Sequence, residues 1–501
     1  MTLPSRHSGA ALLVVLLILI LGGLGWFLQQ APAPASVKSE RDQTTAQALA
    51  GAKEALLGYA AYYPESNSNP SDTPHPRKGF VPGHLPCPDT GNALENEGAE
   101  AGTCESKGIS AIGHFPWRSL GVPPPRDGEG ECLWYAVSGN HKANPKADLL
   151  NPDSDALLTI VTADGTTLAE QVVAVLFSAG ASLPDQQREY TKGECRWDYD
   201  ASRFLDTLNG VNNAALNAAP EGISRFIVAN ANATFNDRLL WITRDELFAR
   251  VEARLPPDAL FAENYPTDAD ALALTQRVAT CLMRFGEENA QYRLPWAAPL
   301  NLTAAAPETF HFDRLADAKN LLAGRAPYSV SYSQEILKGA LLSACPASNR
   351  THSACRLLVK EACPDFLPVA GRPDSGDTYN SHNGWWDKWK DHLFYVVAPG
   401  FAPKDAAAAD CAATPEECLQ IGGHAYAAAV IFAGAPLPGQ IRQGTSAKMQ
   451  IAHYLEGENA ITLQTGGKKL ERAGNDRIAC IAYNATAASD AARFSLVADC
   501  G

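Results

Sequence analysis

Residues 9–28 of the chain read GAALLVVLLILILGGLGWFL, and this stretch decides how the fold is interpreted. No charged residue lies between Arg6 and Lys38. As a helix, the nineteen apolar residues Ala10 to Leu28 are long enough to cross a bilayer core of about 30 Å. The sequence therefore predicts a long N-terminal hydrophobic helix that holds the chain in a membrane by a single pass.

Three interpretations of this N-terminus remain open. In the first, residues 1–9 are a short basic leader that is cleaved between Gly9 and Ala10. In the second, Ala33-Pro34-Ala35 is the A-x-A site of a secretory signal, although nineteen residues are long for its apolar part. In the third, nothing is cleaved and the segment is a plain membrane anchor. We favour the first, and all three place residues 64–501 outside the cytoplasm.

The composition is that of a globular protein that is not suited to binding nucleic acid. Hydrophobic residues make up 46% and charged residues 19% of the 501 residues, which is typical of chains with a packed core. The formal net charge is −14, and no long run of Lys or Arg occurs. Because nucleic acid is bound through basic surfaces, we expect no nucleic-acid partner.

Twelve cysteines, none of them in a C-x-x-C pair, predict disulfides. An even number outside the cytoplasm is typical of a disulfide framework, and the short ligand spacings of a zinc site are missing. Closeness in sequence predicts the pairs Cys87–Cys104, Cys132–Cys195, Cys411–Cys418 and Cys480–Cys500. The others would pair among themselves: Cys281, Cys345, Cys355 and Cys363. We expect no metal and no other cofactor.

Residues 39–63 predict an amphipathic helix that follows the apolar run. Its apolar side chains recur in steps of three and four residues, at Leu49, Ala52, Leu56, Tyr59 and Tyr63. Ser39 and Asp42 form a capping box at its start. Pro32 and Pro34 would separate it from the membrane segment, since proline cannot donate a backbone N–H. The narrow, alanine-rich stripe suits close packing against a sheet.

The second half of the chain repeats the order of sequence blocks in the first half. The matching blocks are 133–137 (LWYAV) and 393–397 (LFYVV), 174–184 (AVLFSAGASLP) and 429–438 (AVIFAGAPLP), and 236–239 (NDRL) and 475–478 (NDRI). Three matches in one order predict two copies of a helix-plus-sheet module, near 39–255 and 266–483. The predicted divisions are a leader (1–9), a membrane-spanning and periplasmic helix (10–63), a first module (64–255) and a second, duplicated module (256–501).

The N-terminus and the block order together resemble the type IV pilins and type II secretion pseudopilins. Arg6 to Gly9, followed at once by the apolar run, resembles their short leaders. Trp134-Tyr135, Ser178-Ala179-Gly180 and the strand after Asp237 follow the order of the globular part of a major pseudopilin. The family usually has Glu at the fifth mature position, where this chain has Val14, and the pseudopilin at the filament tip also lacks this acid.

This resemblance implies a fold, a location and a set of partners. The implied fold is α+β, with a long N-terminal hydrophobic helix followed by two tandem pilin-like modules of a helix on an antiparallel sheet, stapled by disulfides. The implied location is the bacterial inner membrane, single-pass, with the bulk of the chain periplasmic or extracellular. The implied partners are other pilin or pseudopilin subunits, bound through residues Ala10 to Leu28, and a prepilin peptidase.

Two other classes of function compete with assembly. His382, His392 and His424, with Asp387 and Asp391 nearby, could form the zinc or acid–base site of a hydrolase, although scattered surface histidines explain them as well. Three indoles could stack on glycan or insert into a partner, or they could cap the core of the second module. These tryptophans are Trp385, Trp386 and Trp389.

A calcium site is a further alternative for the loop that precedes the first strands. Its candidate ligands are Asp89, Asp127, Glu129 and Glu131, on turns rich in Gly and Pro. The EF-hand spacing is absent, and the acid that the pseudopilin calcium loop carries is replaced here by Ser182. We therefore expect no metal, no catalysis, and a minor pilin- or pseudopilin-like subunit at the tip or in the initiation complex of its filament.

Overall fold

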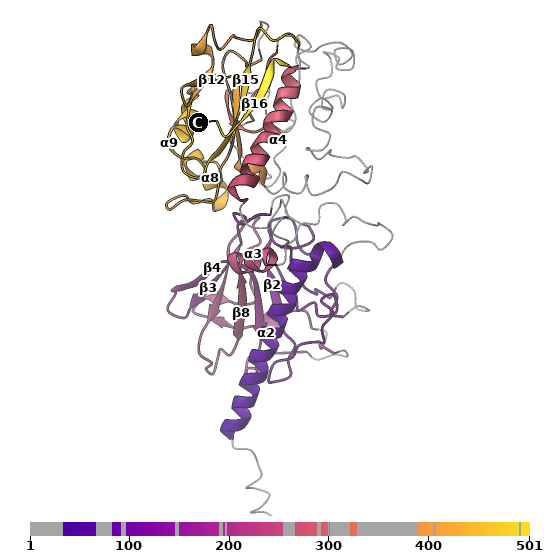
Figure 1. The fold of residues 1–501 in the computed structure, drawn as a ribbon. Helices are drawn as coiled ribbons and strands as arrows, with labels where there is room; N and C mark the ends of the chain where they lie inside the picture. The colour runs from indigo at the N-terminus through magenta and orange to yellow at the C-terminus, as the bar shows by residue number, and fades with distance from the viewer. Residues whose placement is uncertain are drawn as a thin grey trace, which may run out of the picture.

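The computed structural model describes two modules that lie one above the other along an elongated molecule (Figure 1). The first module comprises the described residues up to 253, and the second comprises those from 266 onwards. The described residues are 34–66, 83–91, 97–145, 150–189, 194–195, 198–253, 266–287, 292–298, 300, 321–327, 389–403, 407–489 and 492–500.

The first module opens with helix α2, Pro34–Ser66. Pro34 stands at the first helical position, where a missing N–H removes no helical hydrogen bond. The helix starts before Ser39, so the predicted capping box does not form its N-terminus. Its buried face runs from Thr45 to Ala61. This face packs on strands β4 and β8, whereas the first turns are exposed and extend beyond the module (Figure 1).

The predicted fold class and location are both corrected here. Helix α2 is alanine-rich and polar along most of its length, because only its sheet-facing stripe is apolar. Within the described part of the chain, no helix is long and apolar enough to cross a membrane. The prediction of a fold that opens on a long hydrophobic helix, and that of a single-pass inner-membrane location, are therefore wrong for this structure. The run at residues 10–28 lies outside the described residues.

The first module is built on a six-stranded sheet. Its strands are β1 (Ala111–His114), β2 (Trp134–Val137), β3 (Leu158–Thr162), β4 (Thr167–Ser178), β7 (Ser224–Val228) and β8 (Arg238–Thr243). Strand β4 pairs antiparallel with β2, β3 and β8, but β3 and β7 are parallel. The sheet is therefore mixed, and the predicted purely antiparallel sheet is corrected. The smaller elements are η1 (Ala201–Arg203), the hairpin β5 (Thr207–Leu208) and β6 (Val211–Asn212), and α3 (Arg244–Glu252).

The second module has a five-stranded antiparallel sheet in the order β16-β15-β13-β10-β9. Its strands are β9 (Ala323–Arg325), β10 (Leu393–Val397), β13 (Ala428–Phe432), β15 (Arg477–Tyr483) and β16 (Phe494–Ala498). Helix α4 (Asp268–Glu287) packs against β13, β15 and β16 (Figure 1). The remaining elements are η4 (Lys390–His392), η5 (Pro415–Glu417), β11 (Leu419–Ile421), β12 (His424–Tyr426), α8 (Gly444–Lys448), η6 (Ile451–His453), α9 (Gly457–Thr465) and β14 (Lys469–Leu470).

The strand registers align the two modules residue by residue. In the first, Trp134 faces Phe177, which faces Leu239 on β8. In the second, Phe394 faces Ile431, which faces Ile478 on β15. These pairs correspond if Gly180 is matched with Gly434, which places Ser178 opposite Phe432 in the comparison. The sequence blocks 174–184 and 429–438 differ by one residue in length. In the register, residues 174–184 correspond to residues 428–438, so the shorter block lacks the counterpart of Ala174, which is Ala428.

A second correspondence lies at the other edge of each sheet. The Tyr135 hydroxyl donates to the carbonyl of Pro86 at 3.1 Å. Its counterpart Tyr395 donates to Pro295 at 3.2 Å. Each proline belongs to a Leu-Pro segment that crosses the edge strand closely, at Gly113 of β1 and at the matching glycine of β9. The two edges are therefore constructed in the same way.

Each module has its own hydrophobic core. One cluster draws its buried residues only from positions 271–500. The other clusters draw theirs only from positions 49–247. The division between these clusters falls between residues 247 and 271. Among the residues that the structure describes, a polar network joins the modules.

Candidate functional site

The candidate site is a buried polar network that occurs once in each module, at the end of the sheet where β4 or β13 leaves it. In the first module, Arg188 folds back over the turn that follows β4. Its Nη1 donates to the carbonyl of Gly180 at 2.8 Å, and its Nη2 donates to Oε1 of Gln186 at 2.6 Å. The guanidinium lies 5.2 Å from the ring centroid of Phe204. The arginine therefore holds the turn against the core.

The second module repeats this arrangement after β13. Nη1 of Arg442 donates to the carbonyl of Gly434 at 2.7 Å, and Nη2 donates to Oε1 of Gln440 at 3.2 Å. The guanidinium lies 4.6 Å from the ring centroid of Tyr454. In both modules the glutamine also accepts the N–H of the leucine three residues before it. The two turns are built from the same residue types in the same roles.

A pair of carboxyl groups completes the network in the first module. Asp206 precedes β5, and Asp237 immediately precedes β8. Oδ2 of Asp237 accepts the backbone N–H of Asp206 at 2.8 Å and Nδ2 of Asn213 at 2.9 Å. Oδ2 of Asp206 accepts the backbone N–H of Asp237 at 3.2 Å, and the two carboxyls also hydrogen-bond each other. The pair therefore ties the loop after η1 to the start of β8.

The second module holds the equivalent pair, Glu456 and Asp476. Oδ2 of Asp476 accepts the N–H of Glu456 at 3.3 Å and Nδ2 of Asn459 at 2.9 Å. Oε1 of Glu456 accepts Nε2 of Gln440 at 2.8 Å, as Oδ1 of Asp206 accepts the glutamine of the first module at 2.8 Å. We call Asp206–Asp237 and Glu456–Asp476 the carboxyl pairs.

Burial determines the charge of the carboxyl pairs. It raises the pKa of Asp237 to about 8, with the neighbouring Asp206 as the next cause. Burial, followed by the charge of Glu456, likewise raises the pKa of Asp476 to about 8. Two carboxylates in contact cannot both ionise readily, so each pair retains a proton at neutral pH. This proton supplies the hydrogen bond between the two carboxyls.

The described partners of the carboxyl pairs belong to the chain itself. They are backbone N–H groups and the side-chain amides of Gln and Asn. Acid–base catalysis requires a carboxyl within reach of a substrate proton. Asp237 and Asp476 are at most 3% exposed, and their hydrogen bonds tie loops to the last strand of each sheet.

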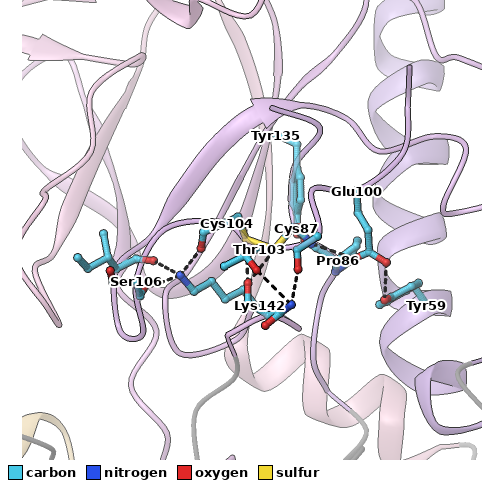
Figure 2. Close-up of a disulfide and its surroundings, with 12 residues drawn as sticks. Tyr59, Pro86, Cys87, Glu100, Thr103, Cys104, Ser106, Tyr135 and Lys142 are labelled. Carbon is cyan, nitrogen blue, oxygen red and sulfur yellow. Dashed lines mark hydrogen bonds between the residues drawn. A yellow bond between two sulfur atoms is a disulfide. The ribbon is translucent and has the colours of Figure 1, made fainter. Parts of the chain in front are cut away.

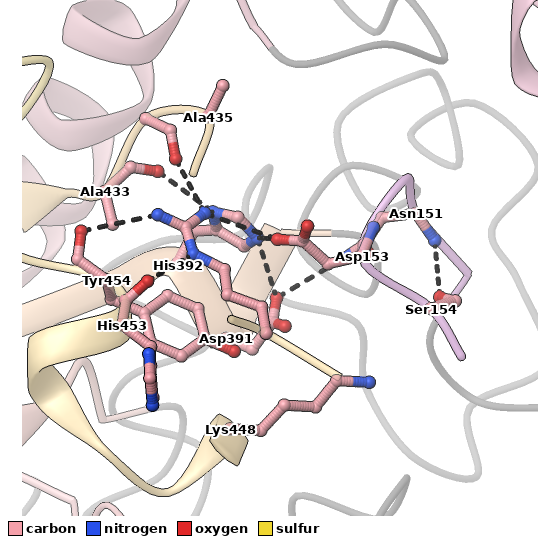
Figure 3. A network of polar contacts seen from close by, with 12 residues as sticks. Asn151, Asp153, Ser154, Asp391, His392, Ala433, Ala435, Lys448, His453 and Tyr454 are labelled. Atoms are coloured by element: carbon pink, nitrogen blue, oxygen red, sulfur yellow. Dashed lines mark hydrogen bonds and ion pairs between the residues drawn. The ribbon is translucent and has the colours of Figure 1, made fainter. Parts of the chain in front are cut away.

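The network of the second module also contacts the first module (Figure 3). Oδ2 of Asp153, in the loop that follows β2, lies 3.3 Å from Nη1 of Arg442 and 3.0 Å from Nε2 of His392. Nearby, Asp155 accepts the backbone N–H of Gly444 and lies 3.1 Å from Nζ of Lys448. Acids of one module therefore meet bases of the other, and the contacts at Asp153 are buried.

Of the histidines and aspartates predicted to form one site, the structure places His392 beside Asp391 but leaves His424 exposed on a strand. His392 is fully buried in the contact between the modules, where its Nδ1 lies 2.9 Å from the carbonyl of Ala433. Asp391 is buried beside it, whereas His424 is exposed on β12. His382 and Asp387 lie outside the described residues.

The predicted tryptophan patch is described only at Trp389. This indole is 1% exposed and packs edge-on against His392 and Phe432, with centroids 4.9 Å and 6.0 Å away. It belongs to the core of the second module, which was the alternative to partner binding. Trp385 and Trp386 lie outside the described residues.

Of the four acids considered for calcium, Asp89 and Asp127 cap loops, whereas Glu129 pairs with Arg41 and Glu131 lies 3.7 Å from Arg188. Asp89 accepts the N–H of Gly91 at 3.0 Å and that of Gly98 at 2.7 Å. Asp127 accepts the Ser178 hydroxyl at 2.8 Å and the Gly180 N–H at 3.1 Å. Across the residues that the structure covers, no group of three or more His, Cys, Asp or Glu could hold a metal ion.

Disulfides staple both modules in the pairs expected from sequence closeness. The bonded pairs are Cys87–Cys104, Cys132–Cys195, Cys411–Cys418 and Cys480–Cys500. Cys281 is also disulfide-bonded. Beside the first pair, Lys142 donates to the carbonyls of Cys104, Ser106 and Ile109, and so closes the same loop by a second means (Figure 2). Burial lowers the pKa of Lys142 to about 8.

Comparison with known proteins adds no relative. No protein-family model, no curated protein and no solved structure matches this chain. The predicted leader residues Gly9 and Ala10 lie outside the described residues.

The sequence similarity between the two modules extends beyond the three matching blocks and includes residues of the network. The matching blocks continue past Pro184 and Pro438 as DQQR and GQIR, which contain the glutamine and the arginine. The segments Phe204-Leu205-Asp206 and Tyr454-Leu455-Glu456 also match each other and contain the first acid of each carboxyl pair.

Proposed function

We propose that this chain is a non-enzymatic, minor pilin- or pseudopilin-like subunit of the tip or initiation complex of a type IV pilus or type II secretion pseudopilus. The observation that carries the proposal is the placement of α2. Its later turns pack on the first sheet, and Arg41 and Asp42 still contact the module through Glu129 and Arg238, whereas residues 38–40 before them are exposed and the helix start extends beyond the module (Figure 1). Such a helix connects a head to whatever its N-terminal segment binds.

The N-terminal segment supplies the partner contact in this proposal. Residues 10–28 are apolar and uncharged, and we assign them to contacts with the corresponding segments of other pilin or pseudopilin subunits. A prepilin peptidase would expose Ala10 by removing residues 1–9. Val14, in place of the usual Glu, suits a subunit that stands at the end of a filament rather than in its shaft.

The head supports an end position by its size and its construction. Two modules with separate cores, joined by a buried ion network, form a large and cross-linked body. A body of this size would crowd neighbours in a repeating shaft. The exposed, disulfide-stapled modules also suit an extracytoplasmic assembly.

The test is complementation of a deletion strain. We expect the full chain and the exposed-site variant His424→Ala to restore piliation or secretion equally, and a chain that lacks residues 10–28 to restore neither. Val14→Glu should move the subunit into the shaft, so that immunogold label spreads from filament ends along their length. Full complementation by the chain without residues 10–28, or loss of function in His424→Ala, would contradict the proposal.

A further inference from the structure

The two modules differ at one sheet edge, the outer edge of β8 and of its counterpart β15. In the second module this edge is covered by β16, which pairs antiparallel with β15 from Tyr483↔Phe494 to Ala479↔Ala498. In the first module, the described strands include none that pairs with the outer edge of β8. The duplication thus contains one completed edge and one open edge.

The exposure of the two strands reflects this difference. The apolar residues 239–241 of β8 are half-buried. Their counterparts, residues 478–480 of β15, are at most 1% exposed because β16 covers them. Leu239 and Trp241 border one core cluster and Leu240 the other, so apolar surface is left on both faces of the edge.

The backbone direction of β8 follows from the second module. The carbonyl of Ile481 accepts the N–H of Ala427 on the β13 side, so Cys480 directs its N–H and C=O towards β16. Trp241 corresponds to Cys480 and therefore directs its own backbone groups outwards. In agreement with this, the Trp241 carbonyl accepts Nζ of Lys53, from α2, at 2.9 Å.

Lys53 of α2 lies at this edge and occupies the outward carbonyl of Trp241. Its ammonium also pairs with Glu246 at 2.7 Å, and its side chain is 19% exposed. A lysine at a strand edge opposes pairing with a second copy of the same edge, because that would bring two ammonium groups together. A strand from a different protein need carry no such lysine, and it has to displace the hydrogen bond from Lys53 to the Trp241 carbonyl, while Lys53 keeps its ion pair with Glu246.

We propose that the outer edge of β8 is a strand-addition site, which accepts one extended, antiparallel strand of a partner protein. The partner strand would carry alternating apolar side chains, as β16 does with Phe494, Leu496 and Ala498, and an acidic flank that competes with Asp42 for Arg238. By the register of the second module, its central residue would lie opposite Trp241, as Val497 lies opposite Cys480. This mode of binding uses main-chain hydrogen bonds for affinity and side-chain pockets for register. The inference rests on the two sheets and does not depend on the proposed function.

The test uses the purified full chain and a synthetic peptide with the sequence of residues 493–499, RFSLVAD. Hydrogen–deuterium exchange is measured on fragments that cover β8 and β15, with and without peptide. The matched control peptide carries Val497→Pro, which removes the N–H that would face β8. The protein variants are Lys53→Ala and Leu239→Pro, the second of which removes an outward N–H and spares the pairing with β4.

We expect the free chain to exchange faster in β8 than in β15, and the peptide to slow exchange in β8 alone. Lys53→Ala should bind the peptide roughly tenfold more tightly, because the competing charged hydrogen bond is gone. Leu239→Pro and the control peptide should abolish the effect. Equal protection of β8 and β15 in the free wild-type chain would overturn the proposal, whatever the variants do. So would unchanged β8 exchange at saturating peptide, or β8 protection that rises with protein concentration alone, which would assign the edge to a second copy.

Discussion

At the scale of single residues, the arginine–glutamine–carboxyl network is the feature that the two modules share most closely. Arg188 and Arg442 each donate to a glycine carbonyl of their own turn. Of the two, Arg442 also contacts an acid of the other module. Arg188 instead lies 3.7 Å from Glu131 of its own module. One residue type therefore closes a turn in both modules and joins the modules in one of them.

The carboxyl pairs predict how stability depends on pH. Because the pKa of Asp237 and of Asp476 is raised from 3.8 to about 8, the folded state keeps protons that the unfolded state loses above about pH 4. Their contribution to stability is therefore full below about pH 4 and falls as the pH rises through about 8.

Neutralising the buried acids should remove this dependence. We expect Asp237→Asn with Asp476→Asn to flatten the decline in unfolding free energy between pH 5 and pH 9 by at least about 1.4 kcal/mol, the equivalent of one pKa unit. Urea unfolding at the two pH values measures it. The exposed Asp185→Asn is the control, and an identical decline in the double variant and the wild type would contradict the account.

The burial of Trp389 leads to a second prediction. Trp389→Ala should destabilise the second module by about 3–5 kcal/mol, because a large core side chain is removed and a cavity remains. His424→Ala, on the exposed part of β12, should change stability by less than about 0.5 kcal/mol. Thermal unfolding followed by circular dichroism compares them, and equal effects of the two substitutions would show that Trp389 is not a core residue.

At the scale of secondary-structure elements, the segments that follow Leu85-Pro86 and Leu294-Pro295 pass β1 and β9 so closely that each strand requires a glycine there. A Cβ on Gly113 would lie 2.4 Å from the carbonyl oxygen of Asp89, and one on Gly324 would lie 2.0 Å from that of Ala298. Both neighbours are backbone atoms, so neither can move aside as a flexible side chain would.

Alanine at either crossing glycine should therefore destabilise its module by more than about 2 kcal/mol, as expected for overpacking. Gly51→Ala is the matched control, since nothing lies within 4 Å of its Cβ position on the exposed face of α2. That substitution should stabilise the chain by about 0.5–1 kcal/mol through helix propensity. Calorimetry of the three variants checks the opposite signs, and a neutral Gly324→Ala would contradict the crossing.

The elements also show what the sequence could and could not predict. The apolar runs in β2, in β10 and in β4 from Val172 onwards were recognised because these residues are buried on both faces of the sheet. The parallel pair β3 and β7 was missed, since pairing direction depends on contacts between distant segments. The network was missed because Gln186 and Arg188 read as ordinary loop residues until their partners on other elements are known.

At the scale of the whole molecule, the contact between the modules determines their relative position. Asp153 lies between Arg442 and His392, and Asp155 holds Gly444 and Lys448. Removing one partner of a buried ion pair typically costs about 3–5 kcal/mol, because the other charge is left uncompensated. The modules should therefore behave as one rigid body only while these acids are present.

We expect Asp153→Asn combined with Asp155→Ala to separate the modules without unfolding either. Small-angle scattering should show a larger radius of gyration, and calorimetry should resolve two transitions where the wild type gives one. Asp185→Asn serves as the control for loss of an exposed acid. A single transition and an unchanged radius in the double variant would show that other contacts hold the modules together.

The proposed assembly role depends on how the N-terminus is processed. The most direct measurement is the mature N-terminal residue, determined by mass spectrometry in cells with and without a prepilin peptidase. Our account predicts Ala10 when the peptidase is present and an uncleaved chain when it is absent. A mature chain that begins at Ser36 in both strains would contradict it.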